Sequence, residues 1–192
     1  MRLDIASSEA VKYACKYFHY AKRVPFVQCA FSVFNDKNEW CGVIVYSLGA
    51  NNHLAGSVGM VQGSVLELVR VALNGKQEST SKALALALSL KKFAPLCRCV
   101  VSFADPAQSH VGTIYQATNW IYLGQMKGQY EYIINGKQLH GRSVTATYGT
   151  AKGRKSVKVQ GKHKYLFAFS GADRRKFEML KKPYPKRIEH ET

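Results

Sequence analysis

Residues 102–120 read SFADPAQSHVGTIYQATNW, and this stretch joins the end of a strand to the start of a helix. Its apolar residues and those just before it predict a strand over Arg98–Phe103, and the spacing after it predicts a helix over Val111–Asn119. Open α/β sheets usually place their chemistry at strand ends of this kind. Four side chains that can move protons stand there: Asp105, Ser109, His110 and Tyr115.

Asp105 has two interpretations, and both stay open on the sequence alone. Asp105-Pro-Ala-Gln108 has the pattern of a helix cap, with Pro at the first helical position. A carboxylate at a strand end can also take a proton or bind a metal. Asp105, His110 and the distant His19 form a candidate ligand set for Fe(II).

The neighbouring side chains also have two interpretations each. His110 and Ser109 stand beside free N–H groups that can bind an anion, although a lone loop histidine is more often a surface residue. Tyr115 either packs on a helix face or serves as an acid. Because side chains alternate along a strand, Arg70 is expected on the same face of the apolar strand Val65–Leu73 as Leu66 and Leu68. A charge on that face needs a partner.

Strands and helices interleave along the whole chain, which predicts an α/β protein with a mixed sheet. Capping serines and helical spacing predict helices from Ser7 to before Pro25 and over Ser79–Phe93. A turn at Asn35–Asn38 predicts an antiparallel hairpin. The remaining predicted elements are strands over Val27–Phe34, Trp40–Tyr46, Val65–Leu73 and Lys164–Ser170, and a helix over Asp173–Leu180. Tyr122–Ile134 is predicted to form either two short strands or one long strand broken at Gly128.

The length of 192 residues suits a single domain, and its 28 Lys and Arg against 12 Asp and Glu give a net charge of +16. A charge of this size is typical of proteins that bind a polyanion, with nucleic acid the leading candidate. Residues 125–192 hold 16 basic and 5 acidic residues, so the excess is mainly C-terminal. We expect a basic excursion at about residues 135–160 that is mobile without its partner, and a basic C-terminal segment ending in Lys182-Pro-Tyr-Pro-Lys-Arg187.

Individual basic residues predict where DNA binds. On one face of the first predicted helix, basic residues recur at three and four residues with His19, forming one stripe. In the C-terminal part, basic residues alternate with aromatic ones, which suits phosphates and stacked bases, although a solvated charged face is the plainer interpretation. The predicted DNA-binding residues are Lys12, Lys16, Arg23, Arg154, Lys155, Lys158, Lys162 and Lys164.

The cysteine pattern and the termini exclude several classes of protein. Five cysteines without a Cys-x-x-Cys pair indicate neither a disulfide framework nor a structural zinc site, and favour a reducing cytoplasm. The N-terminus lacks the apolar core of a signal peptide, and Ala83–Leu90 is too short to cross a bilayer. We therefore expect no membrane partner.

The order of elements resembles the GNAT acyltransferase fold, in which helices cover both faces of a mostly antiparallel sheet. Tyr115-Gln-Ala-Thr-Asn-Trp120 is similar to the segment in which that fold often carries a tyrosine general acid. GNAT enzymes have a glycine-rich pyrophosphate loop after the fourth strand. Here that place reads Asn74-Gly-Lys-Gln-Glu-Ser-Thr-Ser81, which argues against acyl-CoA as cofactor.

A narrower resemblance, to the Mom DNA-modification proteins of bacteriophages, covers nearly the whole chain. Seven segments carry it: His19-Tyr20, Glu67-Leu-Val-Arg70, Glu78-Ser79, Ser102-Phe-Ala-Asp105, His110-Val-Gly-Thr-Ile-Tyr-Gln-Ala117, Gly161-Lys-His-Lys-Tyr165 and Pro183-Tyr-Pro-Lys186. The family implies conversion of adenine in double-stranded DNA to N6-carbamoylmethyladenine, which blocks host restriction. It also implies that the protein acts in the cytoplasm of the infected bacterium.

Under this hypothesis, Asp105 orients or deprotonates the adenine amine and Tyr115 donates a proton, while His19, Tyr20 and His110 complete the catalytic set. A change at one base requires its extrusion from the stack, between aromatics such as Tyr20 and Trp120. The predicted substrate-binding residues are Arg70, Ser109 and Trp120. Two alternatives remain: an acyl-CoA-dependent N-acyltransferase acting on a protein or small amine, and a DNA-binding module without catalysis.

Overall fold

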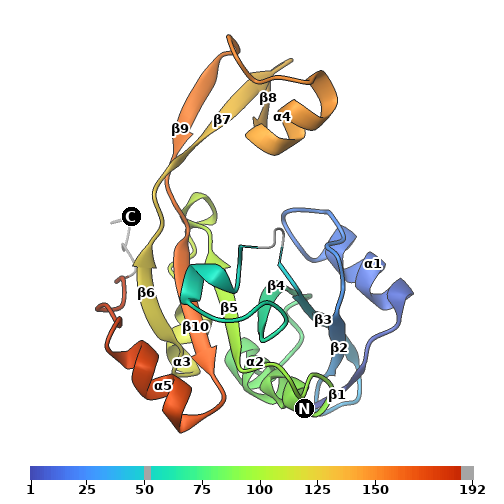
Figure 1. Cartoon of the computed structure of the whole chain (residues 1–192). Coiled ribbons are helices and arrows are strands. Elements are labelled where there is room, and N and C mark those ends of the chain that lie inside the picture. The colour runs from blue at the N-terminus through green and yellow to red at the C-terminus, as the bar shows by residue number, and fades with distance from the viewer. Residues whose placement is uncertain (50–52, 187–192) are drawn as a thin grey trace.

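Seven strands form one mixed sheet in the order β1-β2-β3-β4-β5-β10-β6 in the computed structural model, which describes residues 1–49 and 53–186 (Figure 1). All neighbouring pairs are antiparallel except β4 and β5. The strands are β1 (Arg2–Ile5), β2 (Cys29–Phe34), β3 (Trp40–Ser47), β4 (Val65–Leu73), β5 (Cys99–Ala104), β6 (Ile121–Gln125) and β10 (His163–Ala168).

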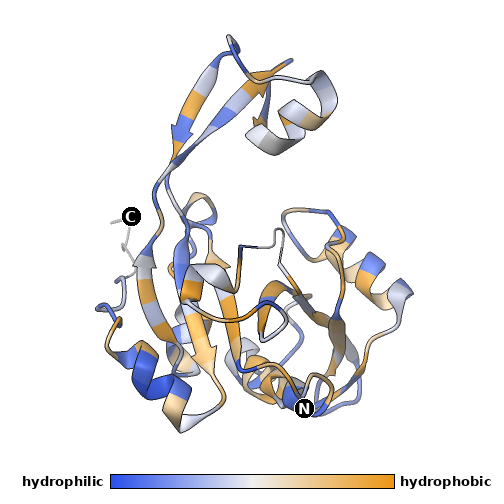
Figure 2. Cartoon of the chain, in the orientation of Figure 1, coloured by the Kyte–Doolittle hydropathy of each residue, from blue (hydrophilic) through white to orange (hydrophobic). Residues whose placement is uncertain are grey.

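Helices cover both faces of this sheet, as predicted. On one face, α2 (Thr80–Ala87) and α3 (Thr113–Ala117) bury Leu84 and Tyr115 against the strands. On the other face, α1 (Ser8–Tyr17) and α5 (Gly171–Glu178) bury residues such as Val11 and Phe177. Alternate residues of β3 enter opposite cores because side chains alternate along a strand. Figure 2 shows that the central strand β5 is mainly hydrophobic.

The parallel pairing of β4 with β5 is short and leaves the ends of these strands apart. Val65–Leu68 pair with Cys99–Ser102, and beyond these residues β4 and β5 are no longer paired with each other. β4 goes on beside β3, whereas β5 stays beside β10. The sheet therefore opens at the C-terminal end of this pair, where a ligand can enter between two strands.

An arm formed by residues 126–162 rises from the edge of the sheet (Figure 1). It consists of a three-stranded sheet in the order β8-β7-β9 and the helix α4. Its elements are β7 (Gln129–Ile134), β8 (Lys137–His140), α4 (Gly141–Tyr148) and β9 (Ser156–Val159). The predicted basic excursion lies within this arm, which pairs its own backbone and buries Val144 completely.

Other predicted boundaries also need correction. The first helix ends at Tyr17 instead of continuing toward Pro25, and residues 18–28 are irregular. The short edge strand β1 has no counterpart in the sequence prediction. The strand predicted over Val65–Leu73 is confirmed. The described residues also form three short 3-10 helices: Gly56–Val58, Leu88–Lys92 and Pro106–Gln108.

The described residues end at Lys186. The predicted domain and its basic C-terminal segment run to residues 187–192, which lie outside the described residues. Within the described part, no helix has both the length and the apolar character needed to span a bilayer.

The base of the arm predicts a measurable sensitivity to substitution. A Cβ atom on Gly161 would overlap the carbonyl oxygen of Met126, while one on Gly56 would meet nothing within 4 Å. Gly161→Ala should therefore lower the free energy of unfolding by about 1–3 kcal/mol, as overpacking does. Gly56→Ala should stay within about 0.5 kcal/mol of the unsubstituted protein. Urea denaturation measures both, and equal stabilities for the two variants would contradict this packing.

Candidate functional site

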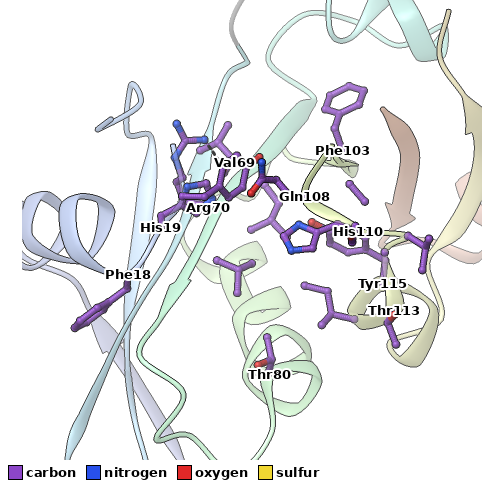
Figure 3. A pocket seen from close by; sticks show the side chains of 18 residues that line it. Phe18, His19, Val69, Arg70, Thr80, Phe103, Gln108, His110, Thr113 and Tyr115 are labelled. Atoms are coloured by element: carbon purple, nitrogen blue, oxygen red, sulfur yellow. Dashed lines mark hydrogen bonds between the residues drawn. The ribbon is translucent and has the colours of Figure 1, made fainter. Parts of the chain in front are cut away.

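A cavity of about 590 Å³ occupies the place where β4 and β5 separate. Figure 3 shows His19 and Arg70 on the side of α1 and β4, and His110 and Tyr115 on the side of β5 and α3. Six of the eight predicted catalytic and substrate-binding residues line this cavity, although they come from four separate segments. They are His19, Tyr20, Arg70, Ser109, His110 and Tyr115.

Arg70 reaches the cavity through an irregularity in β4. Val45 pairs with Arg70 and Tyr46 pairs with Leu68, so Val69 is one extra residue, a β-bulge. The bulge reverses the alternation of side chains, and the prediction that Arg70 shares a face with the leucines is wrong. The Arg70 guanidinium donates instead to the Arg23 carbonyl oxygen at 3.3 and 3.4 Å, beyond the end of α1.

An aromatic wall forms where the chain leaves α1. The rings of His19 and Tyr20 are stacked with centroids 4.4 Å apart, and Tyr20 meets His110 edge-to-face at 6.1 Å. His19 Nδ1 accepts a hydrogen bond from the Ala21 amide at 3.1 Å. Burial, assisted by the nearby Arg70 charge, lowers the pKa of His19 to about 4. His19 is therefore neutral at pH 7, with its proton on Nε2.

Tyr115 is held where the pairing of β4 with β5 ends, at Leu68 and Ser102. Its hydroxyl lies 2.8 Å from Ser102 Oγ, which also donates to the Leu68 carbonyl oxygen at 2.9 Å. Burial raises the pKa of Tyr115 to about 12, so the phenol keeps its proton at neutral pH. Gly112 caps α3 at φ +82°, and a Cβ there would overlap the Tyr165 ring. Only glycine leaves room for this close contact.

Asp105 lies beside the cavity and is not one of its lining residues. Its carboxylate accepts from the Ala107 amide at 3.1 Å, so the capping interpretation is confirmed, for a short 3-10 helix. The same carboxylate forms an ion pair with Lys162 Nζ at 3.1 Å. Asp105 is 17% exposed and directly follows the lining residue Ala104, so a carboxylate that caps one element also lies at the border of the cavity.

The predicted iron ligands do not form a metal-binding group. Across residues 1–49 and 53–186, no three His, Cys, Asp or Glu side chains come together closely enough to hold a metal. His19 Nδ1 already accepts from a backbone amide, and Asp105 is paired with Lys162. The donors of His19, Asp105 and His110 therefore do not fit a shared Fe(II) ion.

Trp120 and Ser109 have contrasting positions. The Trp120 side chain is 0% exposed and packs against Tyr115 and Phe167, so the prediction that it stacks on a base is wrong. Ser109 is exposed at the cavity with φ +54°. Sequence reasoning did not identify Gln108, Thr80 and Phe103, which also line the cavity, because isolated polar or aromatic residues carry no distinctive pattern.

The predicted DNA-binding residues lie in separate parts of the chain. Lys12 and Lys16 are exposed on α1, but Arg23 and His19 follow the end of that helix, so the predicted single stripe is wrong. Arg154 lies over the Tyr148 ring at 4.4 Å. Lys164 Nζ donates to Ser57, and burial lowers its pKa. The arm and its return to the sheet carry Arg154, Lys155, Lys158, Lys162 and Lys164.

The loop before α2 carries groups that compete with an anion for the start of the helix. Free N–H groups at a helix N-terminus can bind an anion such as a pyrophosphate. Here the Ser79 hydroxyl already accepts from the Lys82 amide at 3.2 Å. Glu78 accepts from the Asp36 amide at 2.6 Å, which fixes a negative charge next to the helix start.

The family model described as the Mom protein family matches residues 1–186 of this chain. A spermidine/spermine N-acetyltransferase from Vibrio cholerae, solved in mutant forms, has a TM-score of 0.52 at 10% identity, covering 91% of this chain and 98% of that chain. A spermidine N-acetyltransferase from the same organism, in complex with CoA and spermine, has a TM-score of 0.51 at 8% identity, covering 87% and 94%. A probable GNAT-family acetyltransferase from Chromobacterium violaceum has a TM-score of 0.50 at 11% identity, covering 86% and 81%.

No curated protein matches this chain significantly. The solved structures share the fold of this chain at identities of 8–11%, which confirms the GNAT-like architecture and says nothing of substrate.

The lowered pKa of His19 predicts how its ring titrates. As the pH falls from 7.5 to 5.5, the His19 imidazole should remain neutral, because its pKa of about 4 lies below this range. Two-dimensional NMR of the ring protons measures this, with His19→Gln identifying the signal. A His19 signal that titrates near pH 6.5 would contradict the buried position.

Proposed function

This chain belongs to the Mom protein family, and on that premise we propose that it converts adenine in double-stranded phage DNA to N6-carbamoylmethyladenine. The modification would protect the DNA from host restriction, in the cytoplasm of the infected bacterium. One observation carries the proposal: a single cavity gathers six residues predicted for this reaction, with Asp105 at its border.

The cavity suits a base that has left the stack. Its volume of about 590 Å³ lies within the range of about 300–1,000 Å³ typical of small-molecule sites. Enzymes that act on a base usually extrude it into such a pocket and stack it against aromatic side chains. Tyr20, stacked on His19, offers that surface in place of the buried Trp120.

The reaction needs one N–C bond to form, one proton to leave N6 and a leaving group to depart from the donor. In this proposal the Asp105 carboxylate, at the border of the cavity, orients the N6 amine or accepts its proton. Tyr115 keeps its proton at neutral pH and can give it to the leaving group. His19 donates a hydrogen bond through Nε2, because its Nδ1 lone pair is already used.

Arg70 supports binding of the donor. The lining contains one arginine and no carboxylate, so the cavity favours a carbonyl or anionic group over a cation. The strongly basic chain favours the DNA backbone as the larger partner. Acyl transfer to a small amine is the second candidate, favoured by the GNAT-like fold and opposed by the Glu78 charge next to the start of α2.

Removing the Tyr115 hydroxyl should stop modification. We expect Tyr115→Phe to reduce the modified fraction of deoxyadenosine by about 100-fold or more, the usual contribution of a general acid. Nucleoside mass spectrometry of plasmid DNA from expressing bacteria measures it. Tyr17→Phe is the matched control, because Tyr17 is 59% exposed on α1 and outside the cavity. Undiminished modification by Tyr115→Phe would contradict the assigned role.

Asp105→Asn separates the cap from the chemistry. Asparagine caps a helix as well as aspartate does, so Asp105→Asn should keep most of the stability of the cap. Asp105→Ala should lower the free energy of unfolding by about 1 kcal/mol, and its melting temperature should fall by more than that of Asp105→Asn. Modification should be lost in both variants, while DNA affinity should not fall. Full modification by folded Asp105→Asn protein would leave Asp105 with only its capping role.

A further inference from the structure

The arm has a charge that fits a nucleic acid. Residues 126–162 hold eight basic side chains and one acidic side chain. The acidic side chain, Glu131, already accepts a hydrogen bond from Gln138 at 2.8 Å. Charge complementarity therefore selects a polyanion as the occupant of this surface, and DNA is the polyanion of the proposed function, on which this inference rests.

One face of the arm combines an aromatic side chain with a lysine. Tyr130 pairs with Lys158 across β7 and β9, so their side chains share a face of the small sheet. Tyr132 lies on that same face, and its ring is 3.3 Å from a Cβ position on Gly141, the first residue of α4. Tyr130 is 57% exposed. Figure 1 shows α4 on the side of the arm that overhangs β3 and β4.

The stem of the arm is fixed at the mouth of the cavity. The Met126 amide donates to the Lys162 carbonyl oxygen at 2.9 Å, and Lys162 Nζ pairs with Asp105. Gly128 and Gly161 lie so close to the opposite backbone that neither position has room for a Cβ. The two connecting strands therefore leave the cavity as one closely packed stem.

The stem of the arm is longer than a groove of B-DNA is deep. Lys158 precedes Lys162 by four residues, which is about 13 Å of extended chain. This distance exceeds the depth of either groove of B-DNA, about 8 Å. A side chain at Tyr130 can therefore reach the base stack of a duplex that lies against the mouth of the cavity.

From these placements we infer that Tyr130 enters the DNA stack and fills the space left by the extruded adenine, while Lys158 binds a neighbouring phosphate. An extruded base leaves its neighbours without a stacking partner, which favours its return. An aromatic ring in the gap restores that stacking and holds the base outside. The Lys158 side chain extends along the stem, with Cε 3.7 Å from a Cβ position on Gly128, toward the duplex backbone.

Fluorescence of 2-aminopurine tests this role without requiring the chemical step. The probe is a pool of duplexes in which one adenine is replaced by 2-aminopurine, with randomised flanking bases, because this base brightens when it leaves the stack. The full-length protein should raise the fluorescence at saturation. Tyr130→Ala should bind the pool within about threefold of the unsubstituted affinity but reduce the fluorescence gain about fivefold or more, because stacking on one aromatic contributes on this scale.

Three further variants separate stacking from phosphate binding and from folding. Tyr130→Phe should retain the fluorescence gain. Lys158→Ala should weaken binding and lower its salt dependence, with an unchanged gain at saturation. Val157→Ala changes β9 on the opposite face of the arm and should match the unsubstituted protein. A full gain at saturation with Tyr130→Ala overturns the inference and leaves the proposed function standing. An unsubstituted protein that binds no duplex, or binds without a gain, overturns both.

Discussion

The short parallel pairing of β4 with β5 is the constraint on which the rest of the structure depends. Four residues of each strand are paired, and after them the strands follow different partners. The opening creates the cavity, and six of the eight candidate residues reach it from the elements around that opening. The bulge at Val69 lies at the same point, and it turns Arg70 toward the chain that leaves α1. The end of the β4–β5 pairing thus provides the space, and the bulge beside it provides the positive charge.

Two titratable groups inside the cavity are uncharged, whereas an ion pair lies at its border. Inside, His19 is neutral and Tyr115 is protonated, because burial disfavours both charged forms. At the border, Asp105 and Lys162 neutralise each other while the base of the arm is fixed beside them. A DNA phosphate that attracts Lys162 would leave Asp105 free for the adenine amine. The ion pair between Asp105 and Lys162 therefore connects the arm to the border of the cavity.

Much of this arrangement follows from sequence patterns, and the failures have physical causes. The Asp105 cap and the strand Val65–Leu73 follow from local patterns of capping and apolar residues. The side on which Arg70 points could not be predicted, because a bulge inserts a residue without changing composition. Trp120 resembles a stacking residue in sequence, but tertiary packing buries it. The arm has the glycine and lysine content of a loop, although its apolar residues support a small core around Val144.

The central claim is that the cavity between β4 and β5 receives the adenine of a DNA duplex. A crystal structure of Asp105→Asn protein bound to duplex DNA tests this claim most directly, because this variant should bind without reacting. The account predicts one adenine outside the helix, in the cavity, with its ring against Tyr20 and its N6 atom facing residue 105. A complex in which every base stays stacked, or in which the DNA lies away from the cavity mouth, would contradict it.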